Sequence, residues 1–144
     1  MELKSYFATA PHLVDAVTGT RVWFFDRTAT VVNQTLTDMN VAVAQFLSGP
    51  VEQEVQRRWP GKKVHYVHDW RSCLRYDAEA RELLLSWAKY TRPHARQSTL
   101  TLSPQASIFI RIAATTGVSL LRAGGVPIEL VEDLGPLARE LEAS

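Results

Sequence analysis

The stretch that decides the fold class is residues 64–103, VHYVHDWRSCLRYDAEARELLLSWAKYTRPHARQSTLTLS. Its first residues, 64–68, alternate as in a strand, and residues 98–103 form a second strand pattern. Between them, Asp77 can cap a helix that carries alanines, leucines and Trp87 on one face. A strand, a helix and a strand in succession indicate parallel strands joined by a helical crossover. The sequence therefore predicts an α/β fold.

The chain on the C-terminal side continues this alternation. Pro104 can open a further helix that runs to about Arg122, because proline is favoured in a first helical turn. Gly124-Gly125 would end this helix in a left-handed turn. Residues 126–131 then predict a strand, and residues 137–141 predict a short last helix.

The chain on the N-terminal side begins with strands. Residues 3–10 alternate weakly and end at Pro11, which suits a short first strand. Residues 21–25 and 29–32 are rich in aromatic and β-branched side chains, as strands are. They form either two strands with a turn at Asp26-Arg27 or one long strand.

A helix separates these strands from the central stretch. Thr35 can cap it, and apolar residues then recur at helical spacing up to Leu47. Gly49-Pro50 stops or kinks the helix, because proline cannot donate the next backbone hydrogen bond. A second helical piece continues to Trp59. The complete predicted order is ββαβαβαβα.

Composition narrows the class of protein. The length of 144 residues fits one domain with a core of its own, so we expect a single domain over residues 1–144. The formal net charge of +1 offers no field that would gather phosphates, so nucleic acid is not an expected partner. The lone Cys73, with no signal peptide and no apolar run of about 20 residues, predicts a cytoplasmic protein without a transmembrane segment.

Several short motifs follow one another in the second half of the chain. They are residues 68–71 (HDWR), 76–81 (YDAEAR), 98–103 (STLTLS) and 124–128 (GGVPI). Together they resemble the STAS fold of sulfate transporters and anti-sigma-factor antagonists, and more narrowly its SpoIIAA-like branch, whose relatives share a CRAL-TRIO-like core. The match extends from about Val64 to Leu134. The resemblance implies a mixed, mostly parallel sheet and a regulatory or scaffolding role through protein–protein contact.

The resemblance also implies where a partner would bind. In anti-sigma-factor antagonists a strand ends in Asp, and a kinase phosphorylates an Asp-Ser-Ser-Gly turn at the following helix start. Residues 78–80 (AEA) carry no hydroxyl, so the sequence does not predict this phosphorylation switch. Aromatic residues and arginines dominate the energetics of interfaces. The expected partner-binding residues are Asp69, Trp70, Arg71, Arg75, Asp77, Glu79 and Arg81.

Residues with catalytic or metal-binding potential are sparse. Cys73 with His68 and Asp69, or the His68–Asp69 pair alone, is a remote enzymatic alternative. His65 and His68 would point to opposite faces of a strand, so they do not predict a metal site. The glycines match no phosphate-binding loop. We therefore expect no enzyme, no metal and no cofactor.

The basic cluster at residues 57–63 (RRWPGKK) is the one local concentration of positive charge. Arginines beside the negative end of a helix are stabilised by its dipole. The favoured interpretation is a solvated helix end with Trp59 in the core, and the alternative is a contact with phosphates or an acidic protein.

The helix expected near residues 108–121 is apolar on more than one face, so it must be covered on more than one side. A second copy of the chain or a partner protein would provide such cover, which predicts a possible homodimer. One alternative is a carrier that encloses a small apolar or lipid-like ligand. Another is that the N-terminal strand pair or the C-terminal helix of the same chain covers this face. The residues expected to serve self-association or ligand binding are Ile108, Phe109, Ile112, Leu120 and Leu121.

Overall fold

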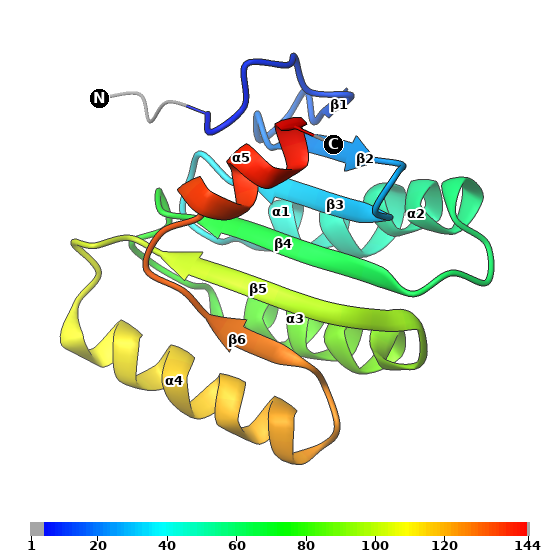
Figure 1. Cartoon of the computed structure of the whole chain (residues 1–144). Coiled ribbons are helices and arrows are strands. Elements are labelled where there is room, and N and C mark those ends of the chain that lie inside the picture. Colours follow the sequence, from blue (N-terminus) through cyan, green and yellow to red (C-terminus); the bar gives the residue numbers. More distant parts are fainter. Residues whose placement is uncertain (1–4, 144) are drawn as a thin grey trace.

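The computed structural model describes residues 5–143 and shows a six-stranded sheet with the order β1-β2-β3-β4-β5-β6 (Figure 1). The strands β1, β2 and β3 pair antiparallel, whereas β3, β4, β5 and β6 pair parallel. The α/β class with a mixed sheet is therefore confirmed. The strands are β1 (Leu13–Val14), β2 (Arg21–Phe25), β3 (Thr30–Gln34), β4 (Val64–Trp70), β5 (Ala95–Leu102) and β6 (Ile128–Leu130).

Helices cross between the parallel strands, as the alternation predicts. α1 (Val41–Phe46), a π-helical turn (Leu47–Val51) and α2 (Glu52–Arg58) join β3 to β4. α3 (Ala78–Thr91) joins β4 to β5, and α4 (Ile108–Ala123) joins β5 to β6. The main core lies between one face of the sheet and α1, α2 and α3, and a smaller cluster joins α4 to β6.

The opposite face of the sheet is covered by α5 (Gly135–Ala143) and the N-terminal segment (Figure 1). Leu134, Ala138 and Leu141 pack there against Trp23, Val32 and Val67, which are the side chains that alternate away from the main core. The Glu142 carboxylate accepts hydrogen bonds from the Ala8 N–H at 2.9 Å and the Thr9 hydroxyl at 3.1 Å.

The strand predicted over residues 3–10 is wrong where the structure describes it, because no strand precedes β1 in residues 5–12. Leu3 and Lys4 lie outside the described residues. The apolar residue of this segment, Phe7, packs its ring 5.1 Å from Trp23 and 5.1 Å from Phe25, centroid to centroid. Phe7 therefore packs against the face of the sheet and does not belong to a strand within it. Residues 21–34 form a hairpin of two strands, which resolves the alternative left open above.

Two helices begin later than predicted, because a better cap follows the expected one. Asn40 caps α1 by accepting the Val43 N–H at 3.0 Å, whereas the Thr35 N–H pairs with the Asp69 carbonyl at 3.1 Å. Ser107 caps α4 by accepting the Ile110 N–H at 3.2 Å, and Pro104 lies in the turn before it. Both caps satisfy backbone donors that a helix start leaves free.

Glycine and proline act at the other helix boundaries as predicted. Pro50 lies inside the π-helical turn, so it kinks the helix between α1 and α2 and does not end it. Gly125 has a φ of 88° directly after α4, in the left-handed region that favours glycine. Among residues 5–143, no helix is long and apolar enough to cross a membrane.

Candidate functional site

A cavity of about 630 Å³ lies on the helical face of the sheet, between α3 and α4. Its floor is formed by β4, β5 and β6, and its walls by side chains of the two helices. Figure 1 shows α4 alongside β6 at the margin of the sheet, whereas α3 lies behind β5. The main lining residues are Tyr66, His68, Trp70, Leu84, Trp87, Leu100, Ile110 and Leu121.

The cavity exists because α4 presents small residues to it. Ala113, Ala114 and Gly117 line the α4 wall, and within the described chain no atom lies within 4 Å of the position that a Gly117 Cβ would take. Nearer its C-terminal end, α4 is fixed to the sheet by Val118 and Leu121, which pack against Ile128. The helix is thus anchored at this end without filling the space towards α3.

Aromatic rings form one end of the cavity. The His68 ring lies between Trp70 and Trp87, with centroid distances of 5.0 Å and 5.6 Å. All three residues are buried, and all three line the cavity. They give it a rigid, mostly apolar surface of the kind that binds small molecules.

His68 is held in place by a hydrogen-bond relay. Trp70 Nε1 donates to Asn33 Oδ1 at 2.9 Å, and Asn33 Nδ2 lies 2.8 Å from His68 Nδ1. Burial, with a smaller contribution from His65, lowers the pKa of His68 to about 3. The ring is therefore neutral at physiological pH.

Tyr76 also lines the cavity, but its hydroxyl is shielded from solvent and lies beside the Cys73 thiol. Burial, with a smaller contribution from Cys73, raises the pKa of this hydroxyl above its usual range, so it stays protonated. Tyr76 therefore contributes its ring to the cavity wall.

A buried carboxylate, which the sequence pattern did not reveal, supports two walls of the cavity. Glu52 on α2 is 4% exposed and accepts hydrogen bonds from the Tyr66 hydroxyl at 3.0 Å and from Trp87 Nε1 at 2.9 Å. Gln56 Nε2 also donates to it at 2.7 Å. Glutamate in a first helical turn is usually solvated, so only the tertiary structure distinguishes this one.

The residues expected to bind a partner do not form one surface. Asp69 and Trp70 are neighbours in a strand, so their side chains alternate between faces. Asp69 is 2% exposed and pairs with Arg71, whose Nε lies 2.7 Å from Asp69 Oδ1. The Arg71 guanidinium also lies 4.0 Å from the centroid of the Tyr6 ring. Trp70 is buried in the cavity wall instead.

The other four expected partner-binding residues lie at or near the start of α3. Arg75, Asp77, Glu79 and Arg81 are all exposed. Arg81 also contributes to the cavity mouth, together with Glu82. These four exposed residues thus differ from Asp69 and Trp70, which are buried, and from Arg71, which is half-buried.

The α4 residues divide between exterior and interior. Ile108, Phe109, Ile112 and Leu120 are 68%, 80%, 57% and 69% exposed, respectively. Phe109 also reaches the cavity mouth, and Leu121 is buried against the sheet. The expected apolar second face of α4 is present and is uncovered in the described chain.

The histidines and the cysteine do not assemble into catalytic or metal-binding geometry. His65 and His68 lie on opposite faces of β4, as predicted, since His65 Nε2 meets Thr99 Oγ1 at 2.8 Å. Asp69 also alternates away from His68, so these two do not form a pair. Within residues 5–143, no group of three or more His, Cys, Asp or Glu side chains is placed to hold a metal ion.

Cys73 is buried, and its Sγ donates to the Thr37 carbonyl at 3.1 Å. Burial raises the pKa of the Cys73 thiol to about 12. Because the thiolate is the nucleophilic form, this cysteine is not activated at neutral pH.

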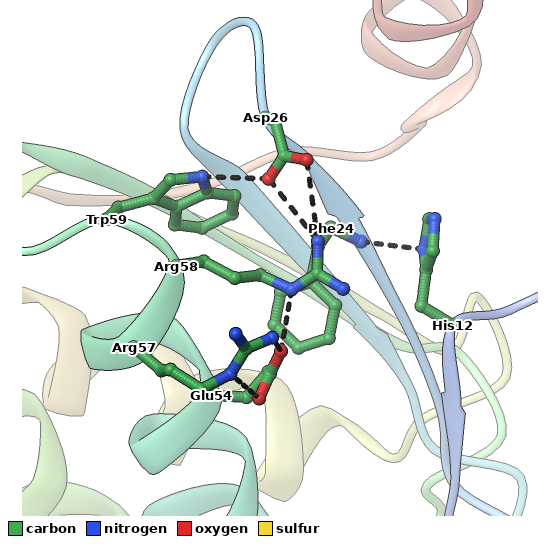
Figure 2. Close-up of polar contacts among 7 residues, drawn as sticks. All are labelled: His12, Phe24, Asp26, Glu54, Arg57, Arg58 and Trp59. Atoms are coloured by element: carbon green, nitrogen blue, oxygen red, sulfur yellow. Dashed lines mark hydrogen bonds and ion pairs between the residues drawn. The ribbon is translucent and has the colours of Figure 1, made fainter.

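Figure 2 shows the first three residues of the basic cluster, Arg57, Arg58 and Trp59, at the end of α2. Arg58 pairs with Glu54 at 2.8 Å and with Asp26 at 3.3 Å, and its guanidinium lies over the Phe24 ring. Trp59 is 3% exposed and donates from Nε1 to Asp26 at 3.0 Å. Trp59 thus lies in the core and Arg57 at the helix end is exposed, which agrees with the favoured interpretation of a solvated helix end.

The same cluster extends to neighbouring residues drawn in Figure 2. Arg57 pairs with Glu54 on the same helix, and His12 Nδ1 accepts the Phe24 N–H at 3.1 Å. Glu54 and Asp26 therefore pair with the two arginines of the cluster, Arg57 and Arg58.

Comparison of the chain with protein-family models, with curated proteins and with solved structures finds no match. The structure itself shows an α/β fold with a six-stranded mixed sheet and helical crossovers.

Proposed function

We propose that this protein binds one small apolar or lipid-like molecule in the cavity between α3 and α4, and acts as a non-enzymatic carrier. The observation that carries this proposal is the cavity itself, about 630 Å³ of mostly apolar surface. Small-molecule sites are concave, occupy about 300–1,000 Å³ and carry a few polar groups among apolar ones. This cavity matches that description.

The chemistry of the cavity surface argues for a ligand. The cavity is half-open, so water can fill it, and its lining is mostly apolar. Apolar surface that stays in contact with water forgoes about 25 cal/mol per Å² of stabilisation that burial would give. Concave apolar surface of this kind is typical of sites that bind small molecules.

Fluorescence titration with the apolar probe N-phenyl-1-naphthylamine tests the proposal. We expect saturable binding of one equivalent, accompanied by quenching of Trp70 and Trp87, which line the cavity. Ala114→Phe, which places a ring in the cavity, should abolish binding. Ser119→Phe adds the same ring at an exposed position of α4 outside the cavity and should leave binding unchanged. Absence of saturable binding, or equal binding by the two variants, contradicts the carrier function.

A second candidate function is regulation through self-association, and the exposed apolar face of α4 favours it. Exposed apolar patches mark interaction sites in many proteins. We expect sedimentation to show a dimer that dissociates in Ile108→Lys and Leu120→Lys. Val17→Lys is the matched control, because Val17 is equally apolar and 84% exposed but lies in the turn before β2. A monomeric wild-type protein would refute this candidate.

A regulatory contact with another protein is the third proposal, and it follows from the resemblance to the SpoIIAA-like branch of the STAS fold. The order of strands and helices and the exposed charged start of α3 support it. A photo-crosslinking residue in place of Glu79 should yield one discrete crosslinked product in the native host. The same residue in place of Glu140, exposed on α5, is the control.

A further inference from the structure

The Trp70–Asn33–His68 relay determines which ring nitrogen of His68 carries the proton. An indole Nε1 can only donate, so Asn33 must present its Oδ1 to Trp70. Its Nδ2 then donates to the Val67 carbonyl at 3.3 Å and faces His68 Nδ1 at 2.8 Å. Nδ1 must accept, and in the neutral ring the proton therefore lies on Nε2.

The Nε2–H group of His68 is available to a molecule in the cavity. In the part of the chain that the structure describes, no hydrogen bond engages Nε2, and His68 belongs to the cavity lining. The cavity thus combines an apolar wall with a neutral donor whose direction is set by two other residues.

We propose that the ligand bears an uncharged hydrogen-bond acceptor, a ketone, ester or aldehyde oxygen on an apolar chain, which His68 Nε2–H binds. This inference deepens the proposed carrier function and rests on it. A carboxylate buried beside a neutral imidazole would have no opposite charge to offset its desolvation. The cation that lines the cavity, Arg81, is exposed and lies beside Glu82 at the mouth.

Displacement of N-phenyl-1-naphthylamine by decane, 2-decanone and decanoate tests the inference. The quantity measured is the ratio of ketone to decane affinity, compared between the wild-type protein and His68→Phe. This comparison cancels the different hydrophobicity of the probes, because transfer from water is common to both proteins. One hydrogen bond is worth about 0.5–1.5 kcal/mol, so the ratio should fall roughly two- to tenfold in the variant.

His65→Phe is the matched control, since it makes the same substitution on the same strand but on the face away from the cavity. It should leave the ratio unchanged. In the wild-type protein, ¹⁵N NMR should show His68 protonated at Nε2, with a resonance that shifts on addition of 2-decanone and not of decane. This measurement keeps the test available if His68→Phe does not fold.

Four outcomes overturn the inference. An unchanged ratio in His68→Phe, or a proton on Nδ1, refutes the role of His68 while leaving the carrier function in place. Decanoate binding that exceeds ketone binding and is lost in Arg81→Gln would show that the cavity selects an anion. Failure of all probes to bind the wild-type protein refutes the carrier function and the inference together.

Discussion

Filling the cavity from α4 should stabilise the protein and destroy its binding capacity at the same time. Gly117→Leu is the substitution of choice, because in the described structure a Cβ at Gly117 meets no atom within 4 Å. Replacing glycine by leucine inside a helix contributes about 0.7 kcal/mol. Partial burial of the leucine side chain in the half-open cavity contributes about 1 kcal/mol more. Together these effects should raise the free energy of unfolding by about 1.5–2 kcal/mol.

Calorimetry and probe titration measure the two sides of this prediction. A gain of this size corresponds to a rise in Tm of roughly 3–8 °C for a chain of this length. Affinity for N-phenyl-1-naphthylamine should fall at least tenfold, which corresponds to about 1.4 kcal/mol. Thr116→Ala is the control that changes helix propensity without filling the cavity, because Thr116 is exposed and does not line the cavity. It should raise helix stability modestly and leave binding unchanged.

The reasoning fails if Gly117→Leu lowers stability. That result would mean that α4 already closes onto α3 in solution and that the leucine overpacks a filled core. Unchanged binding in a stabilised Gly117→Leu protein would equally show that the ligand lies elsewhere.

Three further predictions follow from buried polar groups. Glu52→Ala leaves the Tyr66 hydroxyl and the Trp87 indole without their acceptor, so urea denaturation should show a loss of about 2–6 kcal/mol in the free energy of unfolding. Glu52→Gln keeps one acceptor oxygen and should lose less stability. Equal losses in the two variants would show that the hydrogen bonds to Glu52 do not stabilise the fold. Burial lowers the pKa of His68 from 6.5 to about 3, so the unfolded chain binds a proton that the folded chain does not, and stability should fall as pH drops below about 6.5 towards 3. His68→Phe should reduce that pH dependence without abolishing it, because burial also lowers the pKa of His65 to about 4; an identical pH profile would refute the role of His68. Cys73, with a pKa raised to about 12 by burial, should react with iodoacetamide at neutral pH only after denaturation, and rapid labelling of the folded protein would contradict its placement.

The central strands and crossovers could be predicted from the sequence because their signals are local. Alternation in β4 and the apolar stripe of α3 depend on neighbours within one element, and the structure has both. The opposite orientation of His65 and His68 follows from the same period of two. The errors occur where two local signals compete, as between Thr35 and Asn40 for the cap of α1.

The cavity could not be predicted in the same way, because its volume depends on the distance between two helices. Apolar residues in α4 predict that cover is needed, but they do not say whether α3, a ligand or a second chain supplies it. The relay between Asn33 and His68 is equally hidden, since it joins β3 to β4 across 35 positions in the sequence. Trp70 is one of the predicted partner-binding residues, but β4 continues for two residues beyond His68 and ends at Trp70. The period of two then places Trp70 on the same face as His68, in the cavity wall.

The margins of the sheet constrain how molecules of this protein can meet. The edge strands β1 and β6 are 2 and 3 residues long, respectively. Such short rims offer an approaching chain few unpaired amide and carbonyl groups, so growth of the sheet from one molecule into the next gains little. Molecules of this protein can therefore associate through apolar side chains without also pairing their edge strands, which is the contact that leads to fibrils.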